Sequence, residues 1–137
     1  MIIDAYLVLD DAQAITVTRA STSFIDSLAA GDAISPGARL KVQVNTAFVT
    51  GDSATLTVAL QCDDNSGFNS AKTLVTTSAI AVTSIDAIGD VVLDVVIPPM
   101  CERYIRAYYT VGTGSFSAGK IDARIVLDTA KTMDKQL

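Results

Sequence analysis

The chain has 137 residues and a mass of 14.3 kDa, which suits one domain with a real hydrophobic core. It carries 15 acidic and 10 basic residues, giving a net charge of −5, and it contains neither histidine nor tryptophan. The missing histidine excludes Ser-His-Asp hydrolysis, Cys-His proteolysis and histidine-based zinc chemistry, and the acidic balance makes nucleic acid a poor partner.

The hydrophobic pattern repeats every two residues, which predicts strands with one buried and one exposed face. We expect no convincing helix beyond one turn at Asp26–Ala30. The pattern predicts an all-β domain, an antiparallel β-sandwich or jelly roll of about eight strands, over residues 1–129, with a polar C-terminal tail at 130–137. In chain order, the predicted strands are Ile2–Leu9, Ala14–Thr18, Ser23–Asp26, Leu40–Asn45, Leu56–Cys62, Thr73–Thr77, Val91–Ile97, Ile105–Val111 and Ile121–Leu127.

Glycine, proline and aspartate separate these strands. The segment 50–53, Thr-Gly-Asp-Ser, predicts a hairpin between two strands, and the glycine-rich segment 112–119 predicts a second hairpin with a flexible tip. Phosphate-loop spacing is not met in 112–119. Phe116, the large apolar residue of that segment, either caps one end of the core or projects toward a partner.

The first residues are unusually apolar, with Ile2, Ile3 and Tyr6 close to the start. Two interpretations stay open: this segment is the first strand of the sheet, or it is an arm laid across a neighbouring subunit. No positively charged region precedes an apolar stretch, and no apolar run approaches the roughly 20 residues that span a bilayer. We therefore expect a soluble protein made in a cytoplasm, without a membrane partner.

Acidic residues offer the remaining candidates for chemistry. The segment 63–67, Asp-Asp-Asn-Ser-Gly, begins like a Ca²⁺ loop, but Phe68 stands where the EF-hand needs glycine and Leu74 stands where it needs glutamate. The adjacent pairs Asp10-Asp11 and Asp63-Asp64 would point to opposite strand faces, so we expect solvated loop ends rather than acid/base pairs. We expect no catalytic, metal or cofactor residues, and therefore no enzyme and no cofactor.

Two further features concern surfaces and thiols. If Ile105, Ala107 and Tyr109 point inward, then Tyr104, Arg106 and Tyr108 form an outward stripe, which is either an interface or ordinary packing on an exposed sheet face. Cys62 shares the parity of apolar neighbours and is expected to point inward. We expect Cys62 and Cys101 to be free thiols.

Several blocks of the sequence resemble the capsid cement (decoration) proteins of tailed bacteriophages, in particular the jelly-roll type found in short-tailed phages. They occur in family order and span most of the chain. The blocks are Met1–Asp4, Asp11–Thr16, Leu56–Asn65, Pro98-Pro99, Glu102–Arg106, Tyr109–Val111 and Gly119–Ala123. Cys62 and the tail beyond Asp128 depart from the pattern.

This resemblance implies a structural capsid protein. Such proteins bind the exterior of the expanded phage head, bridge adjacent major capsid subunits and stabilise the shell, often as homodimers. We expect synthesis in the host bacterial cytoplasm and a place on the virion exterior. The dimer interface is predicted at Tyr104, Arg106 and Tyr108. The capsid contacts are predicted at Ile2, Ile3, Tyr6, Phe68 and Phe116. The alternative is a glycan- or receptor-binding β-sandwich module of a phage fibre or adhesin.

Overall fold

The structure is a computed structural model that describes residues 3–26, 38–98 and 102–126, with side chains described from residue 8 onward. The strands are β1 (Ile3–Ala14), β2 (Arg19–Ala20), β3 (Ile25–Asp26), β4 (Arg39–Val49), β5 (Thr55–Asp63), β6 (Lys72–Thr76), β7 (Ile80–Ala81), β8 (Val91–Val96), β9 (Tyr104–Gly112) and β10 (Ala118–Val126). One 3₁₀ turn, η1 (Val82–Ser84), precedes β8. Among the described residues, no helix is long and apolar enough to cross a membrane.

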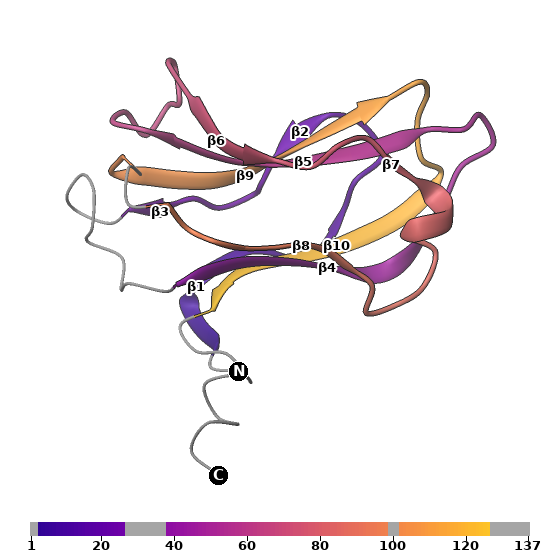
Figure 1. The fold of residues 1–137 in the computed structure, drawn as a ribbon, viewed down its shortest axis with the longest axis horizontal. Helices are drawn as coiled ribbons and strands as arrows, with labels where there is room; N and C mark the ends of the chain where they lie inside the picture. The colour runs from indigo at the N-terminus through magenta and orange to yellow at the C-terminus, as the bar shows by residue number, and fades with distance from the viewer. Residues whose placement is uncertain (1–2, 27–37, 99–101, 127–137) are drawn as a thin grey trace, which may run out of the picture.

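The strands form two antiparallel sheets packed face to face (Figure 1). Sheet A has the order β1-β10-β4-β8, and sheet B has the order β2-β9-β5-β6, with β3 also on β9 and β7 also on β5. If β2/β3 and β6/β7 each count as one interrupted strand, eight strands make the two interlocked sheets of a jelly roll. The predicted all-β sandwich is therefore confirmed.

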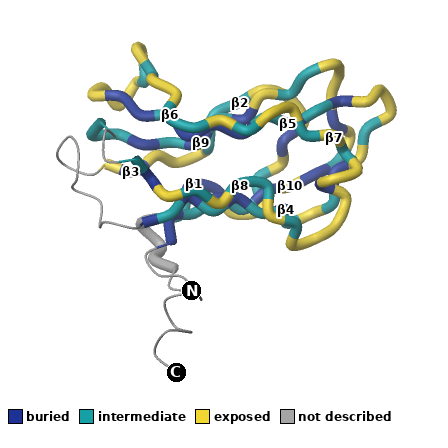
Figure 2. Tube along the Cα trace, in the orientation of Figure 1, coloured by how far each residue is buried: buried dark blue, intermediate teal, exposed yellow. Residues whose placement is uncertain are grey.

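The core lies between the sheets, where buried residues line both inner faces (Figure 2). Alternation places it there: in β4 the side chains of Leu40, Val42 and Val44 are buried while the residues between them are not. Cys62 is buried with a free thiol, as its parity predicted. Cys101, the helical turn predicted at Asp26–Ala30 (apart from Asp26) and the tail 130–137 lie outside the described residues.

Both predicted hairpins are wrong. The segment 50–53 joins β4 of sheet A to β5 of sheet B, and the segment 113–117 joins β9 of sheet B to β10 of sheet A. Each connection therefore crosses the sandwich instead of turning back along one sheet. The predicted strand at Ala14–Thr18 is also wrong, because β1 continues to Ala14 and the chain then leaves sheet A.

Buried carboxylates also correct the expectation of solvated loop ends. Asp10 lies inside β1 and is 2% exposed; it accepts hydrogen bonds from the Tyr109 hydroxyl at 2.6 Å and the Thr22 amide at 2.8 Å. Because Tyr109 belongs to β9, this carboxylate ties sheet A to sheet B. The backbone adds a bond from the Ser23 amide to the Leu9 carbonyl at 3.1 Å. One long side of the sandwich is closed by these contacts.

Candidate functional site

The outer face of sheet B carries a cluster of aromatic rings around one arginine. We call this the aromatic–arginine surface; its members are Phe24, Phe68, Tyr104, Arg106 and Tyr108. In β9 the side chains of Ile105, Ala107 and Tyr109 are at most 1% exposed, so the intervening side chains point outward. The predicted orientation of the stripe is confirmed, and its role as a dimer interface stays a prediction.

Arg106 is the centre of this surface. Its guanidinium carbon lies 4.3 Å from the ring centroid of Phe68 and 5.2 Å from that of Tyr108, and its Nε donates to Gln61 Oε1 at 2.9 Å. Partial burial lowers the pKa of Arg106, which remains a cation at every physiological pH. A cation stacked on two rings is held in one geometry, with each stacking contact contributing about 0.5–1 kcal/mol at a half-exposed site.

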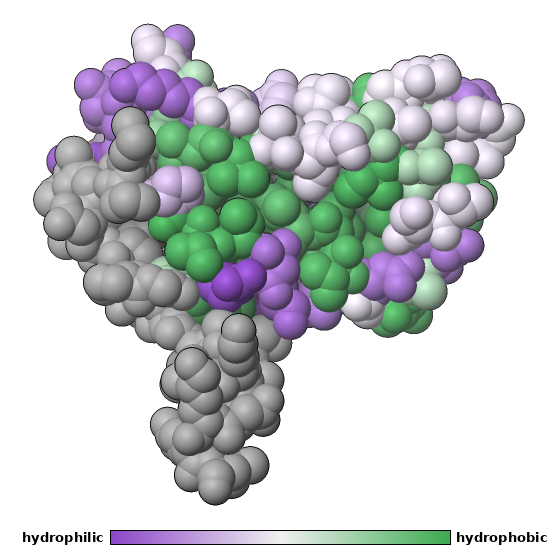
Figure 3. Space-filling model, viewed as in Figure 1, coloured by the Kyte–Doolittle hydropathy of each residue, from purple (hydrophilic) through white to green (hydrophobic). Residues whose placement is uncertain are grey.

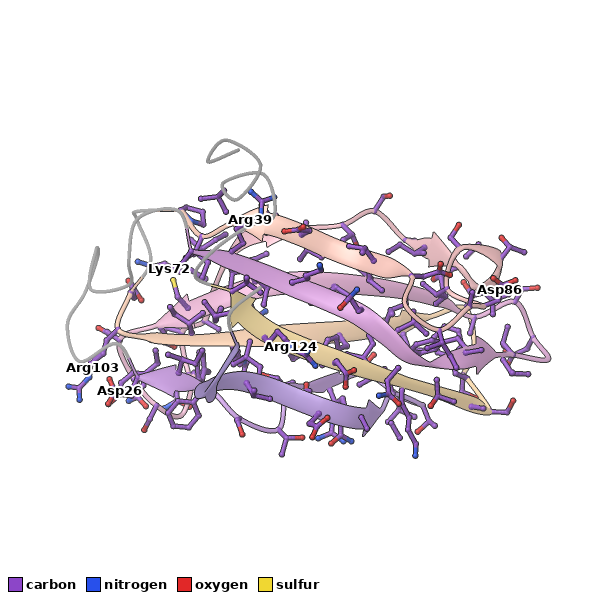
Figure 4. All side chains as sticks on the ribbon, turned by 90° about the horizontal axis from the view of Figure 1, so that it is seen from below. Asp26, Arg39, Lys72, Asp86, Arg103 and Arg124 are labelled. Atoms are coloured by element: carbon purple, nitrogen blue, oxygen red, sulfur yellow. The ribbon has the colours of Figure 1, made fainter. Side chains whose placement is uncertain are left out.

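Phe24 completes the cluster from the residue just before β3, the short strand that pairs with β9. It is 46% exposed and makes edge-to-face contacts with Phe68 at 5.9 Å and with Tyr104 at 5.5 Å between ring centroids. Arg103 stacks on Tyr104 at 5.0 Å and pairs with Asp26 at 2.7 Å; Figure 4 shows this pair at one end of the molecule. The sequence interpretation missed Phe24, although the buried neighbour Ile25 implies that it points outward.

The loop between β5 and β6 is built to present Phe68. Asp63, which is 1% exposed, accepts the amide of Asn65 at 3.2 Å and that of Ser70 at 2.7 Å, and Asn65 Oδ1 accepts the Gly67 amide at 2.7 Å. Phe68 itself has φ +53°, a left-handed conformation that is costly for a bulky residue. Backbone strain of this kind clusters at binding sites. We therefore interpret Phe68 as a residue that the hydrogen-bonded loop positions for contact with a partner.

Acidic groups lie beside this loop. Carboxylate oxygens of Asp63, Asp64 and Glu102 lie within 4.8 Å of one another. Burial raises the pKa of Asp63, but its hydrogen bonds from the Ser70 amide and its other neighbours outweigh that effect and leave the pKa below its ordinary value. The side-chain hydrogen bond and charge of Asp63 raise the pKa of Asp64. Both oxygens of Asp63 accept backbone amides and Glu102 pairs with Lys72, so the protein itself satisfies these two carboxylates.

The predicted capsid contacts fall in different places. Phe68 lies on the aromatic–arginine surface, next to the residues predicted for the dimer. Phe116 is 2% exposed and packs edge-to-face on Phe48 at 4.9 Å, so this ring caps the core, and the expected capsid contact through its side chain is not supported. Ile3 and Tyr6 belong to β1, whose pairing with β10 from Ile3↔Val126 confirms the first-strand alternative; Ile2 lies outside the described residues.

The outer face of sheet A is different in character. Its central positions are polar, with Asp122 accepting the Ala12 amide at 2.7 Å and lying 3.5 Å from Arg124. Figure 4 looks onto this face and shows Arg124 near its middle. Sheet B therefore carries the described outer face that gathers aromatic rings, which is the composition of an interface core.

A family model described as Bbp16 matches residues 9–125, which include β2 to β9 entirely and nearly all of β10. No curated protein matches the chain.

Proposed function

Because the chain belongs to the Bbp16 family, with all of sheet B and most of sheet A inside the matched range, we propose that it is a capsid cement protein of a tailed phage. It binds the exterior of the expanded head, bridges adjacent major capsid subunits and stabilises the shell against the pressure of packaged DNA. The sequence blocks that resemble cement proteins support this proposal. The observation that carries it is the aromatic–arginine surface, a preorganised set of stacked side chains on the outer face of sheet B, half-buried apart from the exposed Phe24.

Preorganisation is what suits this surface to bridging. Arg106 and the rings around it are stacked on one another in the free protein, so a partner has little side-chain freedom left to remove. Tyrosine and arginine are also the residues in which binding energy concentrates. In our proposal Tyr104, Arg106 and Tyr108 hold a homodimer, and Phe68 extends the same contact.

A dimer strengthens the shell by linkage. A protein that binds the expanded lattice and not its precursor stabilises that lattice by mass action. Once one half of a dimer is bound, the second half binds intramolecularly, so modest contacts add up to firm retention. A net charge of −5 also keeps such an exterior protein away from DNA.

The test is co-sedimentation of the purified protein with expanded heads and with unexpanded procapsids. We expect saturable binding to expanded heads, with weaker or no binding to procapsids. Binding to neither particle contradicts the proposal. A glycan-array signal in place of shell binding would support the fibre-module alternative. For a sugar, the two rings are less available, because Arg103 stacks on Tyr104 and Arg106 stacks on Tyr108.

Replacing Arg106 by alanine is expected to weaken the dimer about 30-fold, the effect of a hot-spot side chain of about 2 kcal/mol. The substitution removes the cation that joins the rings of Phe68 and Tyr108. Sedimentation-velocity measurements over a dilution series give the dissociation constant. The matched control is Arg124→Ala on the outer face of sheet A, and equal behaviour of the two variants would contradict the assignment.

A further inference from the structure

Among the residues that the structure describes, no strand pairing closes the long side of the sandwich opposite Asp10. Its rims there are β8, which pairs with β4, and β6 with β7, which pair with β5. Among the described residues, no hydrogen bond joins β8 to β6 or β7. Figure 3 shows the surface between these rims as largely hydrophobic. The half-buried side chains that pack on the core from these rims are Leu74, Val75, Ile80, Val82, Val92, Leu93 and Val95.

β8 has the sequence of a strand that is covered on both faces. Its residues are Val-Val-Leu-Asp-Val-Val, so five of six are aliphatic. Leu93 is paired with buried Val42 and faces the core, whereas Val91 and Val96 are paired with Gln43 and Arg39, point outward and are 53% and 45% exposed. Such near-continuous aliphatic runs are typical of central strands, yet β8 lies at the edge of sheet A.

The other described edges carry the usual protection against strand addition. β1 is interrupted by three register shifts, β2 and β3 have two residues each, and β6 presents Lys72, Thr73 and Thr76 to solvent. β8 carries one charge, Asp94, and Arg39 neutralises it at 2.7 Å. Its pairing with β4 has one register shift, against three for β1. Among the described edges, β8 is therefore the least protected and the most aliphatic.

We propose that an extended segment of a neighbouring major capsid subunit adds to the free edge of β8 as a further strand of sheet A. This inference rests on the proposed function and names the contact that it makes with the shell. Backbone hydrogen bonds along β8 supply affinity, and alternate side chains of the added strand fill the open side. The aromatic–arginine surface on sheet B remains free for the dimer.

Charge indicates the chemistry of the added segment. Asp86 and Asp90 lie just before β8 on the open edge, and Figure 4 shows Asp86 beyond the start of β8 and Arg39 near its end. The segment is accordingly apolar on alternate positions and basic beside these carboxylates.

The variant that tests this edge is Val91→Lys with Val96→Lys, and its matched control is Val17→Lys with Val49→Lys. All four valines are at least 45% exposed, so both variants are expected to fold like the wild type, which circular dichroism checks. We expect binding to expanded heads to fall at least tenfold for the β8 variant and to stay unchanged for the control. Hydrogen–deuterium exchange of the wild type should slow at least tenfold in β8 on the heads.

Three outcomes of these experiments would overturn the inference. Binding of wild type, β8 variant and control to equal extents, with unchanged exchange in β8, overturns this inference and leaves the proposed function standing. Failure of the wild type to bind expanded heads overturns the proposed function and this inference with it. Slowed exchange in β8 of the free protein that grows with protein concentration identifies a second copy as the occupant and also overturns the inference.

Discussion

Replacing Gly119 by alanine is expected to lower the free energy of unfolding by about 4 kcal/mol, the largest effect of any change considered for this fold. Gly119 has φ +144°, a region that residues with a Cβ rarely adopt. A Cβ there would also lie 2.3 Å from the ring of Phe48, which is 2% exposed and packs on Phe116. The ring cannot move aside without opening the end of the core.

The control for this variant is Gly51→Ala. A Cβ at Gly51 meets nothing within 4 Å, and Gly51 has no positive φ. Urea denaturation of the two variants separates the local clash from a general cost of replacing glycine. Equal unfolding free energies for Gly119→Ala and Gly51→Ala would contradict the packing described at this corner.

Replacing Asp10 by alanine is expected to destabilise the protein by about 3 kcal/mol. The change removes two charge-assisted hydrogen bonds and leaves the Tyr109 hydroxyl without its partner inside the core. Burial, followed by the adjacent Asp10 charge, raises the pKa of Tyr109, so the hydroxyl stays protonated and needs an acceptor. Because this bond joins β1 to β9, its loss loosens the closed side of the sandwich.

Asp11→Ala is the matched control, since Asp11 is the exposed neighbour of Asp10 in the same strand. We expect its thermal midpoint to stay close to that of the wild type, while that of Asp10→Ala falls by roughly 10 °C or more. The thermal midpoint of Tyr109→Phe should lie between those of Asp10→Ala and Asp11→Ala, because this change removes one of the two hydrogen bonds to Asp10. A wild-type midpoint for Asp10→Ala would show that the carboxylate does not hold the sheets together.

The strands were predictable because burial in this fold has a local signature. Leu40, Val42 and Val44 alternate with polar residues, and so do the inward residues of β9, so the core faces and the outward stripe followed from parity. The same parity argument at Ile25 would have identified Phe24. Local pattern therefore accounts for the longer strands and for most of the aromatic–arginine surface, but not for the two-residue strands β2 and β7.

The pairing of strands was not predictable in the same way. Segment 50–53 has turn residues whether the chain returns along one sheet or crosses to the other, and in a jelly roll it crosses. Burial of Asp10 depends on Tyr109, which lies 99 positions away in the sequence. The left-handed φ of Phe68 depends on the buried Asp63 loop. The crossing of segment 50–53 and the burial of Asp10 come from contacts between distant segments, whereas the Phe68 conformation comes from loop hydrogen bonds that residue type alone does not reveal.

The most direct measurement of the central claim is a cryo-electron microscopy reconstruction of expanded heads decorated with the purified protein. The proposal predicts jelly-roll density on the outside of the shell, placed across the boundary between adjacent major capsid subunits, with the aromatic–arginine surfaces of two copies facing each other. Saturating protein that leaves the shell exterior bare, or density that lies within one subunit without touching its neighbour, would contradict a cementing function.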